Sequence, residues 1–298
     1  MIMAKGSDCR KSAFSVASKI SVTAVEVTDS ARELEQSHLC GPTAALVQAE
    51  ALAGVALLGA EMVQADETIS LRLRVSGPLG GVLVENAADG SLRGYTHTKV
   101  MNDLDEAEEL DTSVALGDLA EVQVIRSTSG KILSSASIDV HPASVSAAVE
   151  AFYRQSLQRQ VAIQTHAQSY GEFIEAARGV MVECLPDGDQ AVFNRIRLLF
   201  EDMTVLECLE SAASLETVCE TLGLTDCHFF DPKPLRFGCR CSTERIQSML
   251  SGLPTGDLDE MAAKNEPVQI YCHMCGKGYR IEHAFIQDIL NTRAANKA

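Results

Sequence analysis

Two close pairs of cysteines stand near the end of the chain. One residue separates Cys239 from Cys241, two separate Cys272 from Cys275, and thirty lie between the pairs. Thiolate sulfur is a preferred zinc ligand, and two short loops that each supply two ligands are a common way to build a structural site. The spacing therefore predicts one bound zinc ion held by all four sulfurs, rather than four unrelated buried thiols.

The one-residue spacing of the first pair leaves two interpretations open. A Cys-x-Cys segment holds a metal tightly, yet its sulfurs are also near enough to form a strained disulfide with each other. The site is then either a plain structural zinc ribbon or a redox switch that releases its metal on oxidation. His273 lies inside the second pair and is expected to point to solvent rather than to replace a thiolate.

The sequence gives no sign of an enzyme. Four thiolates leave zinc no open position for a reactive water. The chain has no glycine-rich phosphate loop, no serine-centred elbow and no His-Glu-x-x-His motif. A thiol oxidoreductase that uses Cys272 and Cys275 would need a βαβ context, which is missing. We therefore expect no catalytic residues and no cofactor besides zinc.

Six further cysteines are isolated in the sequence, and each is expected to be a small buried apolar residue. Ten cysteines without an evident secretory signal favour reduced thiols and metal over a fixed disulfide framework. Three of the six fall in the segment interpreted below as a linker, where oxidation could expose them. The six are Cys9, Cys40, Cys184, Cys208, Cys219 and Cys227.

Composition narrows the possible partners. The 298 residues carry 25 basic and 41 acidic side chains, a net charge of −16, and from Cys239 onward seven of each. Nucleic-acid binders usually present a basic face, so neither part of the chain is an obvious candidate. The most apolar run, residues 51–60, is too short to span a membrane. We expect a cytoplasmic protein, although the mildly basic first twenty residues leave an organelle transit peptide open.

The pattern of residues 1–186 predicts an α+β core domain with antiparallel sheets. Residues 43–63 are apolar nearly all round, as in a buried helix. Another helix is expected at residues 31–38, and an amphipathic one at 144–155. Strands are expected at residues 14–27, 69–75, 82–86, 91–98, 120–125, 132–140, 161–166 and 179–185.

After Pro186 the pattern becomes that of short helices, which are not stable alone. Residues 187–238 are interpreted as a metastable helical linker, with a capping box at residues 204–207. The alternative is that they simply complete a compact domain. Residues 239–298 form the expected zinc domain, with strands at 267–271 and 278–281 and helices around residues 242–250, 258–261 and 284–292. So small a domain should be marginal without its metal.

The zinc motif and its flanks resemble the redox-regulated heat-shock holdase chaperones of thirty-three kilodaltons. The likeness rests on Phe237-Gly238-Cys239-x-Cys241-Ser242-x-Glu244-Arg245, then Cys272-x-x-Cys275-Gly276-x-x-Tyr279. Outside the motif it rests on Gly77-Pro78-Leu79-Gly80, Leu92-Arg93-Gly94-Tyr95, the helix from Pro42 to Ala60, and Asp231-Pro232. This sequence departs from the family pattern at Ser156-Leu157-Gln158, at Arg178-Gly179 and over the first dozen residues, but the zinc motif is intact.

The resemblance implies an ATP-independent chaperone that holds zinc and is inactive when reduced. Oxidation would form the disulfides Cys239–Cys241 and Cys272–Cys275, eject zinc, and unfold the zinc domain and then the linker. Apolar surface would then hold unfolding client proteins, and the active form would associate as a homodimer. The alternative from another class is a constitutive zinc-ribbon adaptor or a nucleic-acid-binding regulator, which the acidic balance disfavours.

Overall fold

The computed structural model describes residues 8–171 and 173–295. Within them the chain divides into two compact units, one that ends at Gly238 and another that begins at Cys239. The first unit combines helices with largely antiparallel sheets, which confirms the predicted α+β class. Of the first dozen residues, on which a targeting segment was left open, those before Asp8 lie outside the described range.

Two sheets form the frame of the first unit, and each has six strands in the described part of the chain. One sheet, called sheet A here, contains β1 (Cys9–Ser15), β2 (Ile20–Glu26), β8 (Gln160–Tyr170), β9 (Phe173–Cys184), β10 (Cys227–Phe229) and β11 (Lys233–Pro234). The other, sheet B, contains β3 (Thr68–Val75), β4 (Gly81–Ala87), β5 (Ser91–Thr96), β6 (Ala120–Thr128), β7 (Lys131–Val140) and β12 (Arg236–Phe237). The parallel pairing of β12 with β5 is the exception to the antiparallel pattern.

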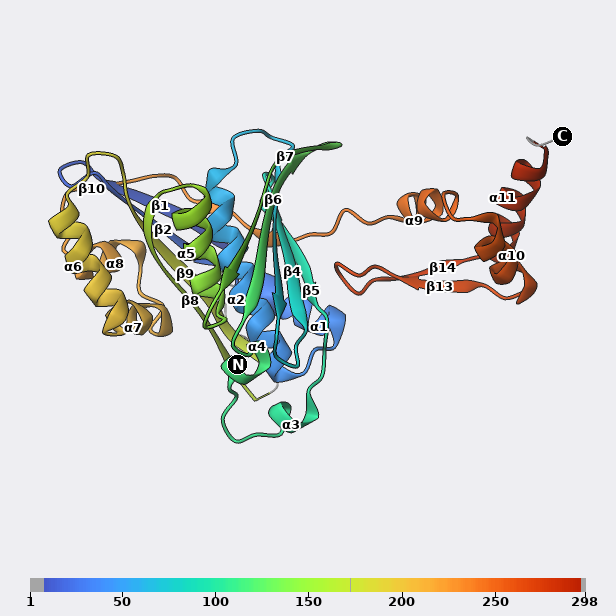
Figure 1. The fold of residues 1–298 in the computed structure, drawn as a ribbon, viewed down its shortest axis with the longest axis horizontal. Helices are drawn as coiled ribbons and strands as arrows, with labels where there is room; N and C mark the ends of the chain where they lie inside the picture. The colour runs from blue at the N-terminus through green and yellow to red at the C-terminus, as the bar shows by residue number, and fades with distance from the viewer. Residues whose placement is uncertain (1–7, 172, 296–298) are drawn as a thin grey trace. The chain divides into compact units, whose positions relative to one another are not determined.

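Helix α2 (Pro42–Leu58) runs between the two sheets and contacts β8 and β9 on one side and β4 and β5 on the other (Figure 1). Proline at its first position has a backbone φ angle that its ring fixes near the helical value. The N–H that proline lacks would be unpaired at this position in any case. With the 3-10 turn η1 (Gly59–Glu61), this segment has the length and composition of a membrane span, but 89% of it is buried inside the protein. It is therefore the core helix, as its all-round apolar pattern predicted.

The remaining helices before residue 187 cover the edges of this core. They are α1 (Thr28–His38), α3 (Asn102–Asp105), α4 (Thr112–Leu116), α5 (Val145–Ala151) and the π-helical turn η2 (Phe152–Ser156). The expectation of a single strand over residues 14–27 is wrong. The chain instead forms the β1–β2 hairpin, which turns through Lys19 at φ 51°. A lysine in this left-handed conformation gives no glycine or asparagine signal in the sequence.

Residues 187–238 belong to the first unit and pack on its sheets. Helices α6 (Gln190–Glu201), α7 (Thr204–Glu210) and α8 (Leu215–Thr221) lie on the face of sheet A that points away from α2 (Figure 1). Strand β9 serves both faces, because Ala177 and Met181 join the core around α2 whereas Val180 and Val182 face the three helices. The helices thus cover apolar side chains that would otherwise meet water.

The predicted capping box at residues 204–207 does not form. Helix α7 follows Met203, a left-handed residue at φ 72°, and has no side-chain cap of its own. The Asp202 carboxylate instead accepts a hydrogen bond from the Thr204 N–H at 3.1 Å. A carboxylate two residues before the threonine therefore accepts from an N–H of the first turn, and the threonine hydroxyl does not act as the cap.

The second unit is a small hairpin with three helices. Its elements are α9 (Thr243–Leu250), α10 (Thr255–Ala263), β13 (Val268–Tyr271), β14 (Gly278–Ile281) and α11 (His283–Ala295). Its buried apolar residues are Ile246, Leu250, Leu258, Ala262, Tyr279, Ile281 and Ile286. Only a few large side chains contribute to this core, so a further stabilising element is expected.

Candidate metal centre

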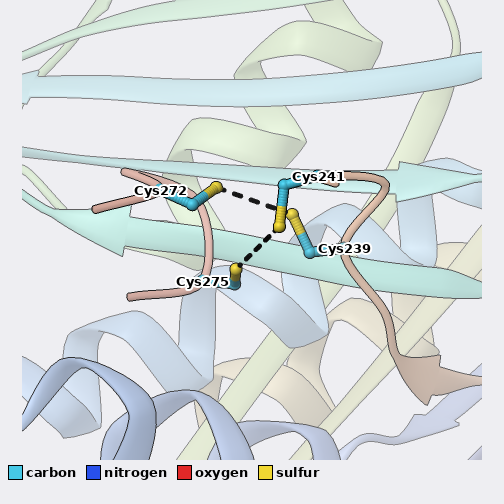
Figure 2. Close-up of side chains that lie close together, drawn as sticks. All are labelled: Cys239, Cys241, Cys272 and Cys275. Atoms are coloured by element: carbon cyan, nitrogen blue, oxygen red, sulfur yellow. Dashed lines mark hydrogen bonds between the residues drawn. The ribbon is translucent and has the colours of Figure 1, made fainter. Parts of the chain in front are cut away.

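The four cysteines of the two predicted pairs meet in the second unit. The sulfurs of Cys239, Cys241, Cys272 and Cys275 all lie within 4.8 Å of one another. Figure 2 shows the two pairs on separate loops with their side chains turned toward a common point. Between the pairs, the Cys239 and Cys272 sulfurs lie 3.8 Å apart and the Cys241 and Cys275 sulfurs 3.4 Å apart.

Local backbone structure places the second pair. Strands β13 and β14 pair in register up to Tyr271 and Gly278, and the chain reverses between them. Within this turn the Gly276 N–H donates to the Cys272 carbonyl at 2.8 Å, and the Cys272 N–H donates to the Lys277 carbonyl at 2.9 Å. Gly276 has a φ of 68°, a left-handed conformation that glycine adopts without steric cost. The hairpin therefore presents both sulfurs on one rigid turn.

The first pair is held by the start of a helix. Ser242 caps α9, its hydroxyl accepting a hydrogen bond from the Arg245 N–H at 3.3 Å. The Arg245 guanidinium turns back and donates to the Arg240 carbonyl, between the two cysteines, at 2.9 Å. The Cys-x-Cys loop is thereby tied to the first turn of α9.

The separations suit a tetrahedral metal ion. Zinc–thiolate bonds of about 2.3 Å in tetrahedral geometry place neighbouring sulfurs about 3.8 Å apart. Two of the sulfur–sulfur separations, 3.8 and 3.4 Å, lie near that value, and all of them stay within 4.8 Å. The group could therefore hold one metal ion with little rearrangement.

A tyrosine supports the site from beside the sulfurs. The Tyr279 hydroxyl donates a hydrogen bond to Cys241 Sγ at 2.9 Å, and its ring is buried in the small core. This hydrogen bond to Cys241 raises the pKa of Tyr279 well above its ordinary value, so the phenol stays protonated and able to donate. Sequence reasoning gave Tyr279 no role, because 38 positions separate it from Cys241.

The crowded thiols need a cation to ionise together. Burial raises the pKa of Cys272, and burial with the neighbouring sulfurs also raises that of Cys275. A divalent ion reverses this tendency, because its charge favours the thiolate and binding releases the protons. A metal ion and protons therefore compete directly for the four sulfurs.

The other predicted positions lie elsewhere. His273 is exposed, and the group that could hold a metal consists of the four cysteines. Of the six further cysteines, Cys184 and Cys219 are buried and the rest are half-buried, and none forms a disulfide. The expectation that each is fully buried therefore holds for two of them. Their sulfurs are outside the cluster, although Cys219 and Cys227 contact each other.

Comparison with known proteins identifies the relatives of this chain. Residues 8–282 match the family model described as Hsp33 protein. A 33 kDa chaperonin from Thermus thermophilus is 30% identical over 283 residues, which cover 90% of this chain and 82% of that protein. A 33 kDa chaperonin from Oceanobacillus iheyensis is 24% identical over 91% of this chain and 95% of its own length.

A solved structure shares the fold. The crystal structure of the 33 kDa chaperonin (heat shock protein 33 homolog) from Thermotoga maritima superimposes with a TM-score of 0.86 at 18% identity. It covers 96% of this chain and 99% of the Thermotoga chain. The family match and the relatives confirm the resemblance drawn from the cysteine motif and its flanks: the chain belongs to the Hsp33 family.

Proposed function

We propose that this chain is a redox-regulated, ATP-independent holdase chaperone. In the reduced state Cys239, Cys241, Cys272 and Cys275 hold one zinc ion and the chaperone is inactive. The observation that carries the proposal is the gathering of these sulfurs at separations suited to tetrahedral zinc, in a unit with few large core residues. Membership of the Hsp33 family supports it.

Oxidation would convert the four thiols into two disulfides. For each pair, a thiolate attacks hydrogen peroxide to give a sulfenic acid and hydroxide, which takes up a proton from solvent to become water. The second thiol then displaces a further water as the disulfide forms. The family resemblance favours Cys239–Cys241 and Cys272–Cys275. Because Cys239 lies close to Cys272, and Cys241 close to Cys275, crossed disulfides are the competing products that a peptide map must exclude. Either outcome removes the thiolates that bind the metal.

Loss of zinc can unfold the small unit outright. A structural zinc contributes on the order of 10–16 kcal/mol in small domains, whereas whole domains are stable by only about 5–15 kcal/mol. The unit begins at Cys239, directly after β12 and Gly238, and the Gly238 N–H donates to the Leu92 carbonyl. Unfolding of the small unit would therefore begin in the chain directly after this strand of sheet B.

The segment 187–238 then acts as a linker that covers an apolar surface of sheet A. Beneath α6–α8, sheet A presents an apolar face whose buried members are Ala13, Ile20, Val22, Val180, Val182 and Cys184. Release of the helices would expose this face to unfolding client proteins. The proposed organisation is a core domain of residues 1–186, the linker 187–238 and the zinc domain 239–298, with a homodimer as the oxidised form. Nucleic acid and membranes are not proposed as partners, and the proposed location is the cytoplasm.

The test measures metal and chaperone activity in the same samples. Zinc released by hydrogen peroxide is followed with a chromogenic chelator, while light scattering follows aggregation of a heat-denatured client. We expect about one zinc per chain to leave and client aggregation to fall in parallel. Cys40→Ser, which removes a thiol outside the cluster, should behave as wild type. A protein that keeps its zinc in peroxide, or gains no holding activity on losing it, is not such a switch.

A further inference from the structure

A second pair of thiols lies in the first unit, away from the metal centre. Cys219 in α8 is 1% exposed, and Cys227 at the start of β10 is half-buried and packs against the same apolar cluster. Each thiol perturbs the pKa of the other, so the two side chains are neighbours. Cys227 Sγ donates to the Leu224 carbonyl at 3.6 Å. Two cysteines eight positions apart are thus brought into side-chain contact.

A helix-ending turn creates this contact. After α8, Gly223 adopts a left-handed φ of 75°, and the Leu224 N–H donates to the Cys219 carbonyl at 2.9 Å. This is the long hydrogen bond of a Schellman motif, which reverses the chain at a helix end. Because the chain reverses here, Cys227 lies near Cys219.

The two cysteines have separate backbone supports. Cys227 pairs with Ser15 of β1, and its neighbour Asp226 accepts hydrogen bonds from the Ser15 hydroxyl at 2.6 Å and the Ala17 N–H at 2.7 Å. Cys219 is fixed by the packing of α8 on the apolar cluster. Because both backbones are held, a bond between the sulfurs would need side-chain rotation rather than a new fold.

We propose that Cys219 and Cys227 are a second redox pair, independent of the metal centre, which closes into a disulfide that fastens α8 to β10. Hydrogen peroxide is the oxidant considered. The half-buried Cys227 sulfur attacks the peroxide, giving a sulfenic acid and one water. The Cys219 sulfur then attacks Cys227, the S–O bond breaks, and a second water leaves as the disulfide forms.

The local environment makes Cys227 the first thiol to react, and it makes oxidation of the pair slow. Burial raises the pKa of both thiols, but the neighbouring Cys219 thiol works against this at Cys227. Thiolates rather than thiols are the reactive species, so neither cysteine is activated in the folded protein. The pair is therefore suited to sustained rather than brief oxidation.

The disulfide would restrain the segment 187–238. Closing a loop of roughly nine residues removes conformational freedom from the unfolded chain. It should slow hydrogen exchange of the α8 amides by on the order of tenfold or more, because α8 then opens only together with β10. This effect on the linker rests on the proposed function, whereas formation of the disulfide does not.

The test is a peptide map of the full-length, zinc-loaded protein exposed to hydrogen peroxide and quenched with an alkylating agent. A protease that cleaves after glutamate cuts at Glu220, and trypsin cuts at Arg236 and so separates Cys227 from Cys239 and Cys241. The two peptides that carry Cys219 and Cys227 then stay together only through a disulfide between these two cysteines. Cleavage at Glu210 separates Cys208 from both. We expect a linked Cys219–Cys227 peptide that reduction abolishes and that Cys227→Ala lacks.

Controls separate this pair from other thiols and from the metal centre. Cys208→Ser, which removes a half-buried thiol in the same segment, should leave the linked peptide in place. Zinc release is measured on the same samples, so failure of the proposed switch and failure of this pair are read independently. Recovery of Cys227 in alkylated form after sustained exposure to peroxide, well beyond oxidation of the metal-site cysteines, or its linkage to Cys208 or Cys9, would overturn the proposal. The wild-type map decides this even if the alanine variant folds poorly.

Discussion

Replacing Tyr279 with phenylalanine tests how the protein sets the reactivity of the metal centre. The substitution keeps the buried ring and removes the hydroxyl that donates to Cys241 Sγ at 2.9 Å. Hydrogen bonds to charged groups contribute about 1.5–3 kcal/mol, and each 1.4 kcal/mol is tenfold in an equilibrium constant. The same range follows from residues that support metal ligands, whose loss costs about 10–100-fold in affinity.

Two measurements follow from this substitution. Zinc affinity, measured by competition with a chelator, should fall by about 10–100-fold in Tyr279→Phe. Zinc release in peroxide should become faster, because a thiolate that has lost its hydrogen bond is a better nucleophile.

The control is Tyr271→Phe on the paired strand β13, where the ring is 63% exposed and the same change should have little effect. If Tyr279→Phe binds zinc within twofold of wild type, or releases it more slowly, the assigned role of the phenol is refuted.

Three further predictions concern the linker, the core helix and the metal-site turn. Phe193→Ala in α6 should destabilise the packing of the helices on sheet A by about 3–5 kcal/mol and increase binding of an apolar dye without oxidant, whereas Leu198→Ala, 58% exposed on the same helix, should not. Burial raises the pKa of Glu50 to about 7 from 4.5, so folded stability should decline as pH rises across this window. Glu50→Gln should remove that decline, giving a melting-temperature advantage that grows from pH 5 to pH 8 and corresponds to at most about 3 kcal/mol; an advantage independent of pH would contradict this. Gly276→Ala places a side chain at a φ of 68° and should weaken zinc binding by about tenfold, a cost of roughly 1–2 kcal/mol, and unchanged zinc affinity would show that the turn relaxes.

The metal-centre residues were accessible to sequence reasoning because the signal is local. Each cysteine pair spans no more than four positions, and Gly276 marks the turn that follows. The strands β3 to β7 of sheet B were predicted for a similar reason: alternating apolar residues and the turn at Asp89-Gly90 fix a hairpin within a short stretch, whereas β12 was not predicted. Such patterns depend on neighbours in the chain rather than on the fold.

Features that depend on distant contacts were missed. The β1–β2 hairpin turns through Lys19 without a glycine, so its two strands were interpreted as one. The hydrogen bond from Tyr279 to Cys241 joins positions 38 apart, and no periodicity reports it. Cys219 and Cys227 looked isolated because their contact depends on the turn at Gly223 and on pairing of β10 with β1.

Packing also decides what short helices do. The helices of segment 187–238 are too short to persist alone, and in this structure they gain stability by covering the apolar face of sheet A. Sequence can identify the apolar stripe on α6 but not the strands that receive it. The proposed function requires that this packing depends on the metal centre.

The most direct test is native-state hydrogen exchange of the zinc-bound protein and of the same protein after peroxide has removed the zinc. We predict that amides of residues 190–210, in α6 and α7, lose protection on oxidation, together with those of residues 239–295, while the paired strands β3 and β6 keep theirs. If residues 190–210 stay protected after the zinc has left, the metal centre does not control the covering of sheet A.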